Sequence, residues 1–292
     1  MNEISAPPSV QKTIAASPPA SMLARLARAK GGKWGLALVA FWLIVFIVSL
    51  VWTPYDPFEF HFGDKLQPPS ADFLLGTDKY GRDTLSRIMT GSREVILIST
   101  GGTLLAIALG LFIGITSGFF GHLYDEVIMR SMDIIMAFPS LLLALLVVGV
   151  LGPGELNVVL VIGVVFAPRI ARVARSVVME LRVKEYVQAA QVRGDSVWNI
   201  MLVEMLPNML GPLGVEAGVR FAHALFLSAS LGFLGLGVQP PTPDWGLMVN
   251  EGRDFIEMSP WVSLFPAIAI ATLVVGVNIL SEAYRRVWAG ES

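Results

Sequence analysis

The chain has 292 residues, of which 54% are hydrophobic and only 15% are charged, and its mean hydropathy is +0.66. Soluble globular proteins carry about 25% charged residues, so this composition excludes an ordinary soluble enzyme and indicates an integral membrane protein. The lack of cysteine excludes disulfides and thiolate sites. The net charge of −2 does not discriminate between partners.

The chain begins with a segment, residues 1–33, that we expect to form a cytoplasmic tail. Residues 1–20 are rich in Ser, Pro and Ala and have no apolar period, which predicts disorder. Met22–Lys33 is a short basic amphipathic stretch, typical of a run along the membrane surface. The apolar stretch that follows lacks a small-residue cleavage site around Val51–Pro54, so we interpret it as an uncleaved anchor helix.

Six segments are candidates for membrane-spanning helices, each of which needs about 20 apolar residues. The fourth segment has a short apolar run, Leu156–Pro168, and spans only if the helix continues through Arg169, Arg172 and Arg175. The sequence therefore predicts an all-α transmembrane domain over residues 34–292. The predicted spans are 34–53, 95–120, 132–151, 156–177, 207–237 and 260–282.

The distribution of Lys and Arg predicts the orientation of these spans. With six spans and a cytoplasmic N-terminus, fourteen of the 21 basic residues lie in inside segments and six in outside segments. This asymmetry follows the positive-inside rule and predicts that both termini are cytoplasmic. It places residues 54–93 and 239–261 outside and the polar segment 185–207 inside.

Three local features predict how the spans pack. Gly110, Gly114 and Gly118 recur every four residues, which predicts one bare face for close helix contact. Pro139 lies early in the third span and should bend it. Arg130 and Asp133 stand three residues apart, a spacing that lets them pair on one helix face.

The segment Glu185–Pro207 is an amphipathic insert between two apolar spans. Glu185–Arg193 can form a short helix, with Tyr186, Ala189 and Ala190 on one side, and Gly194 permits a sharp turn. A second helix would carry an apolar face and lead to Leu206 and Pro207, where proline suits the first turn of the next span. The residues expected on that second face are Trp198, Met201, Leu202 and Met205.

This segment resembles the "EAA" coupling loop of bacterial ABC-importer permeases. Ala189-Ala190, Gly194 and Leu206-Pro207 stand at the spacing of that loop, whereas Gln188 replaces its Glu and Glu204 its Ile. The resemblance implies that the segment docks on a separate ATPase subunit. The residues that it assigns to ATPase coupling are Glu185, Gln188, Ala189, Ala190, Gly194, Leu206 and Pro207.

Four further stretches resemble the C-type permease of the dipeptide, oligopeptide and nickel importer family. They are Leu75–Arg87, Met129–Pro139, Ala171–Arg175 and Leu231–Trp245. The resemblance implies a MetI-like fold in a bacterial inner membrane and import of peptides or related solutes. It implies as partners a second homologous permease, one or two ATP-binding subunits, an external solute-binding protein and membrane lipid, but no nucleic acid.

The fifth span carries Glu216, Arg220 and His223 on one helix face. Because a charge in hydrocarbon costs several kcal/mol, about 2.5–3.5 on the insertion scale, such groups face the bundle or a water-filled path. They either line the translocation path or form a Glu216–Arg220 pair that fixes the rotation of the helix. The sequence leaves both readings open.

Catalysis by this chain is not expected. It has no phosphate-binding GxxxxGK[ST] loop and no HExxH-like spacing, so we expect no catalytic residue, metal or cofactor, with ATP bound by the partner. Asp78 and Asp83 suit turn capping better than ion binding. An ion-gradient-driven transporter predicts internal repeats, which are not found. An intramembrane hydrolase using His223 with Ser228 or Ser230 lacks a nucleophile elbow.

Overall fold

The structure of the protein is a computed structural model that describes residues 22–290. The expected disorder of residues 1–20 lies outside the described residues. Within them the chain is helical, with a single isolated bridge between Thr77 and Asp83. The helices are α1 (Met22–Arg28), α2 (Gly32–Ser49), α3 (Thr84–Phe120), α4 (His122–Ala137), α5 (Ser140–Leu151), α6 (Glu155–Leu181), α7 (Glu185–Val192), α8 (Val197–Asn199), the π-helix η1 (Ile200–Met205), α9 (Leu206–Phe233), α10 (Trp245–Arg253) and α11 (Trp261–Ala289).

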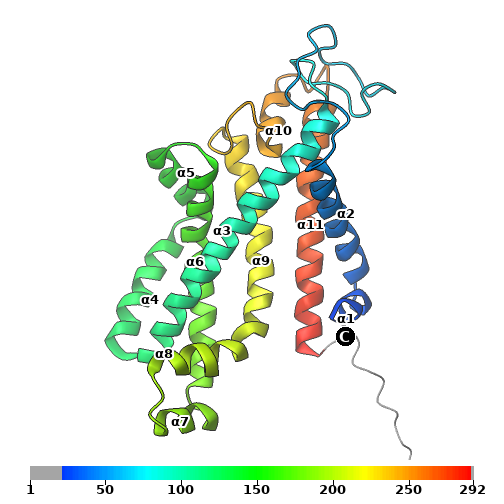
Figure 1. The fold of residues 1–292 in the computed structure, drawn as a ribbon. Helices are drawn as coiled ribbons and strands as arrows, with labels where there is room; N and C mark the ends of the chain where they lie inside the picture. Colours follow the sequence, from blue (N-terminus) through cyan, green and yellow to red (C-terminus); the bar gives the residue numbers. More distant parts are fainter. Residues whose placement is uncertain (1–21, 291–292) are drawn as a thin grey trace, which may run out of the picture.

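The long helices form one elongated bundle (Figure 1). α3 crosses the bundle obliquely and packs along α6, and α9 lies against both of them. α11 packs on α9 and is covered on its other side by α2. The short helices α7 and α8 lie at one end of the bundle, and α10 lies at the opposite end with the loop that joins α2 to α3.

The glycine face expected on α3 is the contact surface with α6. A Cβ on Gly114 would lie 2.4 Å from the Ala171 carbonyl oxygen, and the oxygens of Ala167 and Arg175 stand at 2.8 and 3.0 Å from the corresponding positions of Gly110 and Gly118. The two backbones meet where no side chain fits, which confirms the predicted close packing.

Four of the described helices, α2, α3, α6 and α11, are long and apolar enough to cross a membrane. α4 and α5 together form a fifth candidate, bent by 92° at the break that contains Pro139, so the predicted bend is present. α6 continues through Pro168 and its arginines to Leu181, as crossing the membrane requires. α9 is long enough, with 28 residues, but it carries Glu216, Arg220 and His223 and is not among the sufficiently apolar helices.

The expected pairing of Arg130 with Asp133 is wrong. Asp133 accepts a hydrogen bond from Arg172 Nη2 at 2.6 Å, and Asp125 is held by Arg175, one turn further along α6. Both carboxylates lie on α4 and both arginines on α6. Ion pairs between two helices thus take the place of the pair within one helix, because α4 packs beside the arginine-bearing end of α6.

Candidate coupling surface and translocation path

The segment 185–207 forms a compact hairpin at one end of the bundle (Figure 1). α7 ends at Val192, and Gly194 two residues further on has a φ of +78°, which favours glycine. The Asp195 amide donates to the Ala190 carbonyl at 3.1 Å. The Ser196 hydroxyl then caps α8 by accepting from the Asn199 amide at 3.2 Å. The chain therefore reverses direction at Gly194, between the hydrogen-bonded end of α7 and the capped start of α8.

Apolar side chains of both helices of the hairpin are buried in the main core of the bundle. Val187 and Ala190 of α7 are fully buried and belong to the same cluster as Ile200 and Met201, each 2% exposed or less. Because this contact joins the first helix of the hairpin to the second, the hairpin can transmit a displacement as one body.

The outer face of the hairpin carries exposed apolar side chains. Val192, Trp198 and Leu202 are 89%, 54% and 55% exposed. The sequence predicted one apolar face through Trp198, Met201, Leu202 and Met205, but that face is divided: Met201 and Met205 turn into the core, whereas Trp198 and Leu202 stay outside. Similarly, Ala190 is buried, whereas Tyr186 and Ala189 are exposed.

The coupling residues named from the resemblance occupy both sides of the hairpin. Glu185 is exposed in the first turn of α7, and exposed Gln188 donates to the Val183 carbonyl at 3.4 Å. Leu206 is half-buried at the start of α9, and Pro207 beside it is exposed in its first turn. Together with Ala189, the residues Glu185, Gln188 and Pro207 are free to meet a partner, whereas Ala190 supports the hairpin from within.

The charged stripe of α9 forms an ion pair within the bundle. Arg220 Nε donates to Glu216 Oε1 at 2.6 Å, and the two side chains are only 12% and 17% exposed. Arg169 of α6 is close enough to interact electrostatically with both groups. His223 is exposed, with Nδ1 2.7 Å from the Val219 carbonyl oxygen and its ring 6.2 Å from that of Phe166. The predicted pair of Glu216 and Arg220 is therefore present, with the positive charge of Arg169 nearby.

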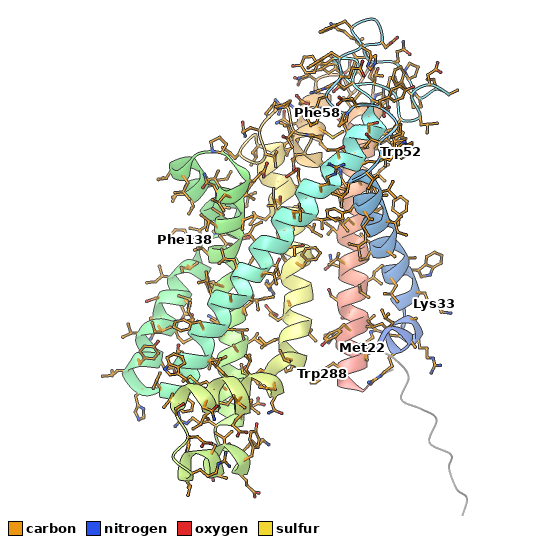
Figure 2. The ribbon with its side chains drawn as sticks, in the orientation of Figure 1. Met22, Lys33, Trp52, Phe58, Phe138 and Trp288 are labelled. Atoms are coloured by element: carbon orange, nitrogen blue, oxygen red, sulfur yellow. The ribbon has the colours of Figure 1, made fainter. Side chains whose placement is uncertain are left out.

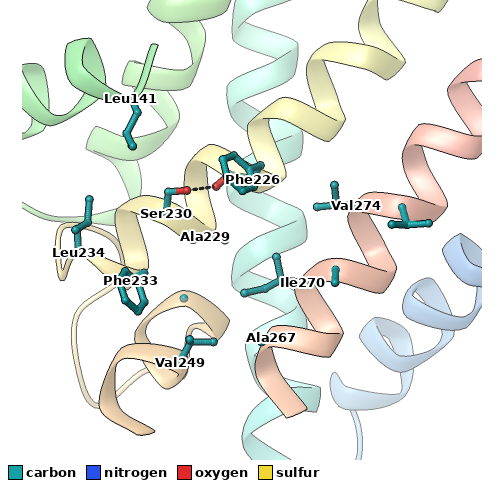
Figure 3. Close-up of a pocket in the computed structure, with 13 residues that line it drawn as sticks. Leu141, Phe226, Ala229, Ser230, Phe233, Leu234, Val249, Ala267, Ile270 and Val274 are labelled. Atoms are coloured by element: carbon teal, nitrogen blue, oxygen red, sulfur yellow. Dashed lines mark hydrogen bonds between the residues drawn. The ribbon is translucent and has the colours of Figure 1, made fainter. Parts of the chain in front are cut away.

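An open apolar cavity of about 540 Å³ lies beyond this stripe, toward the α10 end of α9 (Figure 3). Phe226, Phe233 and Ile270 extend into it from α9 and α11, and Leu141 faces it from α5. The Ser230 hydroxyl is bound to the Phe226 carbonyl at 2.7 Å. One side of α9 thus passes from a charged region to an apolar one.

A buried charge cluster, which the sequence did not indicate, ties the external loop to α10. Glu251 of α10 lies 3.3 Å from Arg82, 3.6 Å from Lys79 and 3.8 Å from Arg87. Asp78 completes the cluster at 2.6 Å from Arg82 and 3.6 Å from Arg87. Arg82 and Glu251 stand 169 positions apart in the chain, so no local pattern indicates their contact.

The capping roles expected of Asp78 and Asp83 are confirmed. Asp78 Oδ1 accepts from the amides of Tyr80 and Arg82 at 2.8 and 3.0 Å, and Asp83 caps α3 by accepting from the Ser86 amide at 2.8 Å. In the part of the chain that the structure describes, no group of three or more His, Asp or Glu side chains could hold a metal ion.

The structure thus combines a bundle of apolar helices, a charged pair inside it and a hairpin at one end, an arrangement suited to a membrane transport subunit. Residues 106–288 match the family model described as "Binding-protein-dependent transport system inner membrane component". This chain is therefore a member of that family, the inner-membrane permease subunits of ABC importers. In this family ATP hydrolysis belongs to a separate subunit, and a second permease and an external binding protein complete the system.

Two relatives support this assignment, and one solved structure shares the fold. The chain is 40% identical over 288 residues to the di/tripeptide transport system permease protein DppC of Pseudomonas aeruginosa, covering 96% of this chain and 94% of that protein. It is 34% identical to the glutathione transport system permease protein GsiD of Pectobacterium atrosepticum, covering 86% and 81%. The inward-facing MetNI methionine ABC transporter shares the fold, with a TM-score of 0.55 at 18% identity over 70% of this chain and 96% of that chain. The ion-gradient-driven alternative is therefore not supported.

Proposed function

We propose that this permease imports small peptides and that its ATPase subunit docks on the outer face of the hairpin 185–207. The observation that carries the docking surface is the exposure of Val192, Trp198 and Leu202 on a hairpin whose inner side chains are buried in the core of the bundle. Apolar side chains gathered on a rigid protrusion mark an interaction site. Glu185 and Gln188 are exposed on α7 beside Ala189 and would form the polar rim.

The proposed assembly has this chain paired with a homologous permease, with one or two ATP-binding subunits below them. An external solute-binding protein would dock on residues 54–93 and 239–261, at the end of the bundle opposite the hairpin (Figure 1). Both chain termini would be cytoplasmic, on the same side as the hairpin. This chain would hold no cofactor, because ATP is bound by the partner.

The substrate class is proposed from the relatives whose names specify di- and tripeptides or dipeptides. We propose that Glu216, Arg220 and His223 line the path. A carboxylate and a guanidinium offer opposite charges, and a peptide carries both an amino and a carboxylate terminus. The apolar cavity beyond them would accept peptide side chains.

Affinity purification of this chain from its native membrane in mild detergent tests the docking surface. We expect a second permease and an ATPase to accompany the wild-type chain and the ATPase alone to be lost in Gly194→Leu, because a side chain is strained at a φ of +78°. Gly149→Leu is the control, since nothing lies within 4 Å of a Cβ at that position. Retention of the ATPase by Gly194→Leu and by Trp198→Glu would contradict the proposal.

The substrate is tested separately, by uptake of labelled di- and tripeptides into vesicles that contain the complete transporter. Uptake that requires ATP and is competed by unlabelled dipeptide supports a peptide substrate. ATP hydrolysis without uptake of any peptide would refute the substrate class and leave the docking surface untouched.

A further inference from the structure

A basic patch lies at the end of the bundle that carries the hairpin 185–207, beside the last turns of α11. It consists of Arg25, Arg28, Lys30 and Lys33, within nine positions of the chain, and Met22 and Lys33 mark its extent in Figure 2. No acidic residue occurs between Met22 and Tyr55. The ion pairs of the described residues include none with Arg28, Lys30 or Lys33. The patch therefore presents positive charge that the described part of the protein does not neutralise.

The patch has a fixed geometry. Leu26 and Ala29 are 8% and 6% exposed and pack against Ala283 and Val287 of α11. Arg25 Nη2 also donates to the Val287 carbonyl at 3.3 Å. The α1 helix is thus held on α11 by an apolar contact and a hydrogen bond.

The turn between α1 and α2 brings the two helices into close contact. Gly31 has a φ of +81°, and a Cβ on Gly32 would lie 1.8 Å from the Leu26 carbonyl oxygen. Only glycine permits this close reversal of the chain. Arg28 and Lys30 are exposed, whereas Leu26 and Ala29 of the same segment pack against α11.

Exposed apolar side chains lie beside these charges. Met22 and Leu23 are 40% and 66% exposed on α1, and Trp34 is 74% exposed in the first turn of α2. Tryptophan is enriched where hydrocarbon meets headgroups, and a basic helix with exposed apolar residues is typical of one lying in the membrane interface. An acidic soluble protein would offer the charge but not the hydrocarbon that Leu23 and Trp34 require.

We propose that α1 and the first turn of α2 form a binding site for anionic phospholipid, in the leaflet on the side of the hairpin 185–207. Arg28, Lys30 and Lys33 contact the phosphate-bearing headgroup, and Leu23 and Trp34 contact the acyl chains. Since α1 is packed on the last turns of α11, an occupied site stabilises this end of the bundle against thermal opening.

The test uses the intact transporter in mild detergent, titrated with dioleoylphosphatidylglycerol or with dioleoylphosphatidylcholine. Bound lipids are counted by native mass spectrometry, and the melting midpoint is measured in parallel. We expect the phosphatidylglycerol to bind more tightly than the phosphatidylcholine and to raise the melting midpoint further. The double variant Arg28→Gln/Lys30→Gln should weaken its binding about 25-fold, about five-fold for each charge removed. Added salt should reduce the preference.

The matched control is Lys65→Gln/Arg253→Gln, which also removes two exposed positive charges, at the opposite end of the molecule. Equal loss of lipid preference in the control would overturn the proposal, as would a wild-type preference retained by Arg28→Gln/Lys30→Gln. Soluble glycerol 3-phosphate should give no protection. If it protects as well as the lipid, the ligand is a free phosphate and the lipid site is refuted. Neither readout depends on the peptide substrate or on ATPase docking.

Discussion

Arg193 and Glu204 join the two halves of the hairpin 185–207 across its turn. Arg193 Nη2 lies 3.3 Å from Glu204 Oε1 and 2.7 Å from Asp195 Oδ2, so one guanidinium bridges the end of α7, the loop and η1. Glu204 stands where the EAA motif has isoleucine. In this chain an ionic contact thus occupies the place of an apolar one, and Arg193 matches the charge that the substitution introduces.

The first prediction concerns this ionic contact. Glu204→Gln should reduce transport per ATP hydrolysed by about two- to five-fold, because exposed ion pairs contribute little each, and the buried apolar side chains of the hairpin should keep it folded. Glu204→Ile should retain coupling and lose its dependence on salt. The measurement is the ratio of peptide uptake to phosphate release, determined at low and at high ionic strength for each variant. Equal ratios in the wild type and Glu204→Gln would show that the contact is irrelevant.

The second prediction concerns the ion pair inside the bundle. Glu216→Gln alone leaves Arg220 without its partner, which should lower the free energy of unfolding by about 3–5 kcal/mol. The double variant Glu216→Gln/Arg220→Met should restore much of that stability. Transport separates the two roles that the sequence left open: a path-lining role predicts that the stable double variant does not transport, whereas a purely structural role predicts recovery of uptake.

The third prediction concerns the helix contact between α3 and α6. Gly114→Ala would place a methyl group 2.4 Å from the Ala171 carbonyl oxygen, where only backbone can move, and should destabilise the bundle by about 1–3 kcal/mol. Gly149→Ala, with no atom within 4 Å, should be neutral or slightly stabilising. Melting temperatures in detergent compare the two. A Gly114→Ala variant as stable as Gly149→Ala would mean that the helices do not pack this closely.

The fourth prediction concerns Asp244, the buried N-cap of α10, which accepts from the Leu247 amide at 2.9 Å. Burial raises the pKa of Asp244 from 3.8 to about 6, although hydrogen bonds from Leu247 and Gly246 oppose the rise. The folded state therefore favours the protonated carboxyl. The stabilisation of the folded state that comes from protonated Asp244 is complete below pH 3.8 and is lost as the pH rises through about 6.

Asp244→Asn should remove this pH dependence, because asparagine caps a helix equally well and does not ionise. Above pH 7 the variant should be more stable than the wild type by up to about 3 kcal/mol. Melting temperatures between pH 5 and 8 provide the measurement. Parallel curves for the wild type and the variant would show that Asp244 does not titrate in this range.

The fifth prediction concerns Glu251 at the external end. Glu251→Gln leaves Arg82 and Arg87 with Asp78 as their remaining carboxylate in the cluster, so the loop before α3 should detach more easily from α10. Trypsin should then cleave at Lys65 faster than in the wild type. Asp254→Asn, which removes an exposed carboxylate that pairs with Arg253, should leave the cleavage rate unchanged. Unaltered cleavage in Glu251→Gln would show that the cluster does not hold the loop.

The sequence by itself determined the class of protein and the features that depend on neighbouring residues. Apolar runs of sufficient length predict helices, four-residue glycine spacing predicts a bare face on α3, Pro139 predicts a bend and Gly194 predicts a turn. The family was recognisable because its motifs are local: each is a short run of residues whose spacing is written directly in the chain.

Only the tertiary structure decided which side chains meet. Asp133 could pair with Arg130 on its own helix, yet it pairs with Arg172, because α6 brings a better-placed cation beside it. Met201 and Trp198 are both apolar and close in sequence, but contact with α7 buries one face of the hairpin and leaves the other outside. Glu251 pairs with Arg82, which is 169 positions away in the chain. These contacts depend on how whole helices pack against one another. Because that packing is set by residues from distant parts of the chain, it leaves no local sequence pattern.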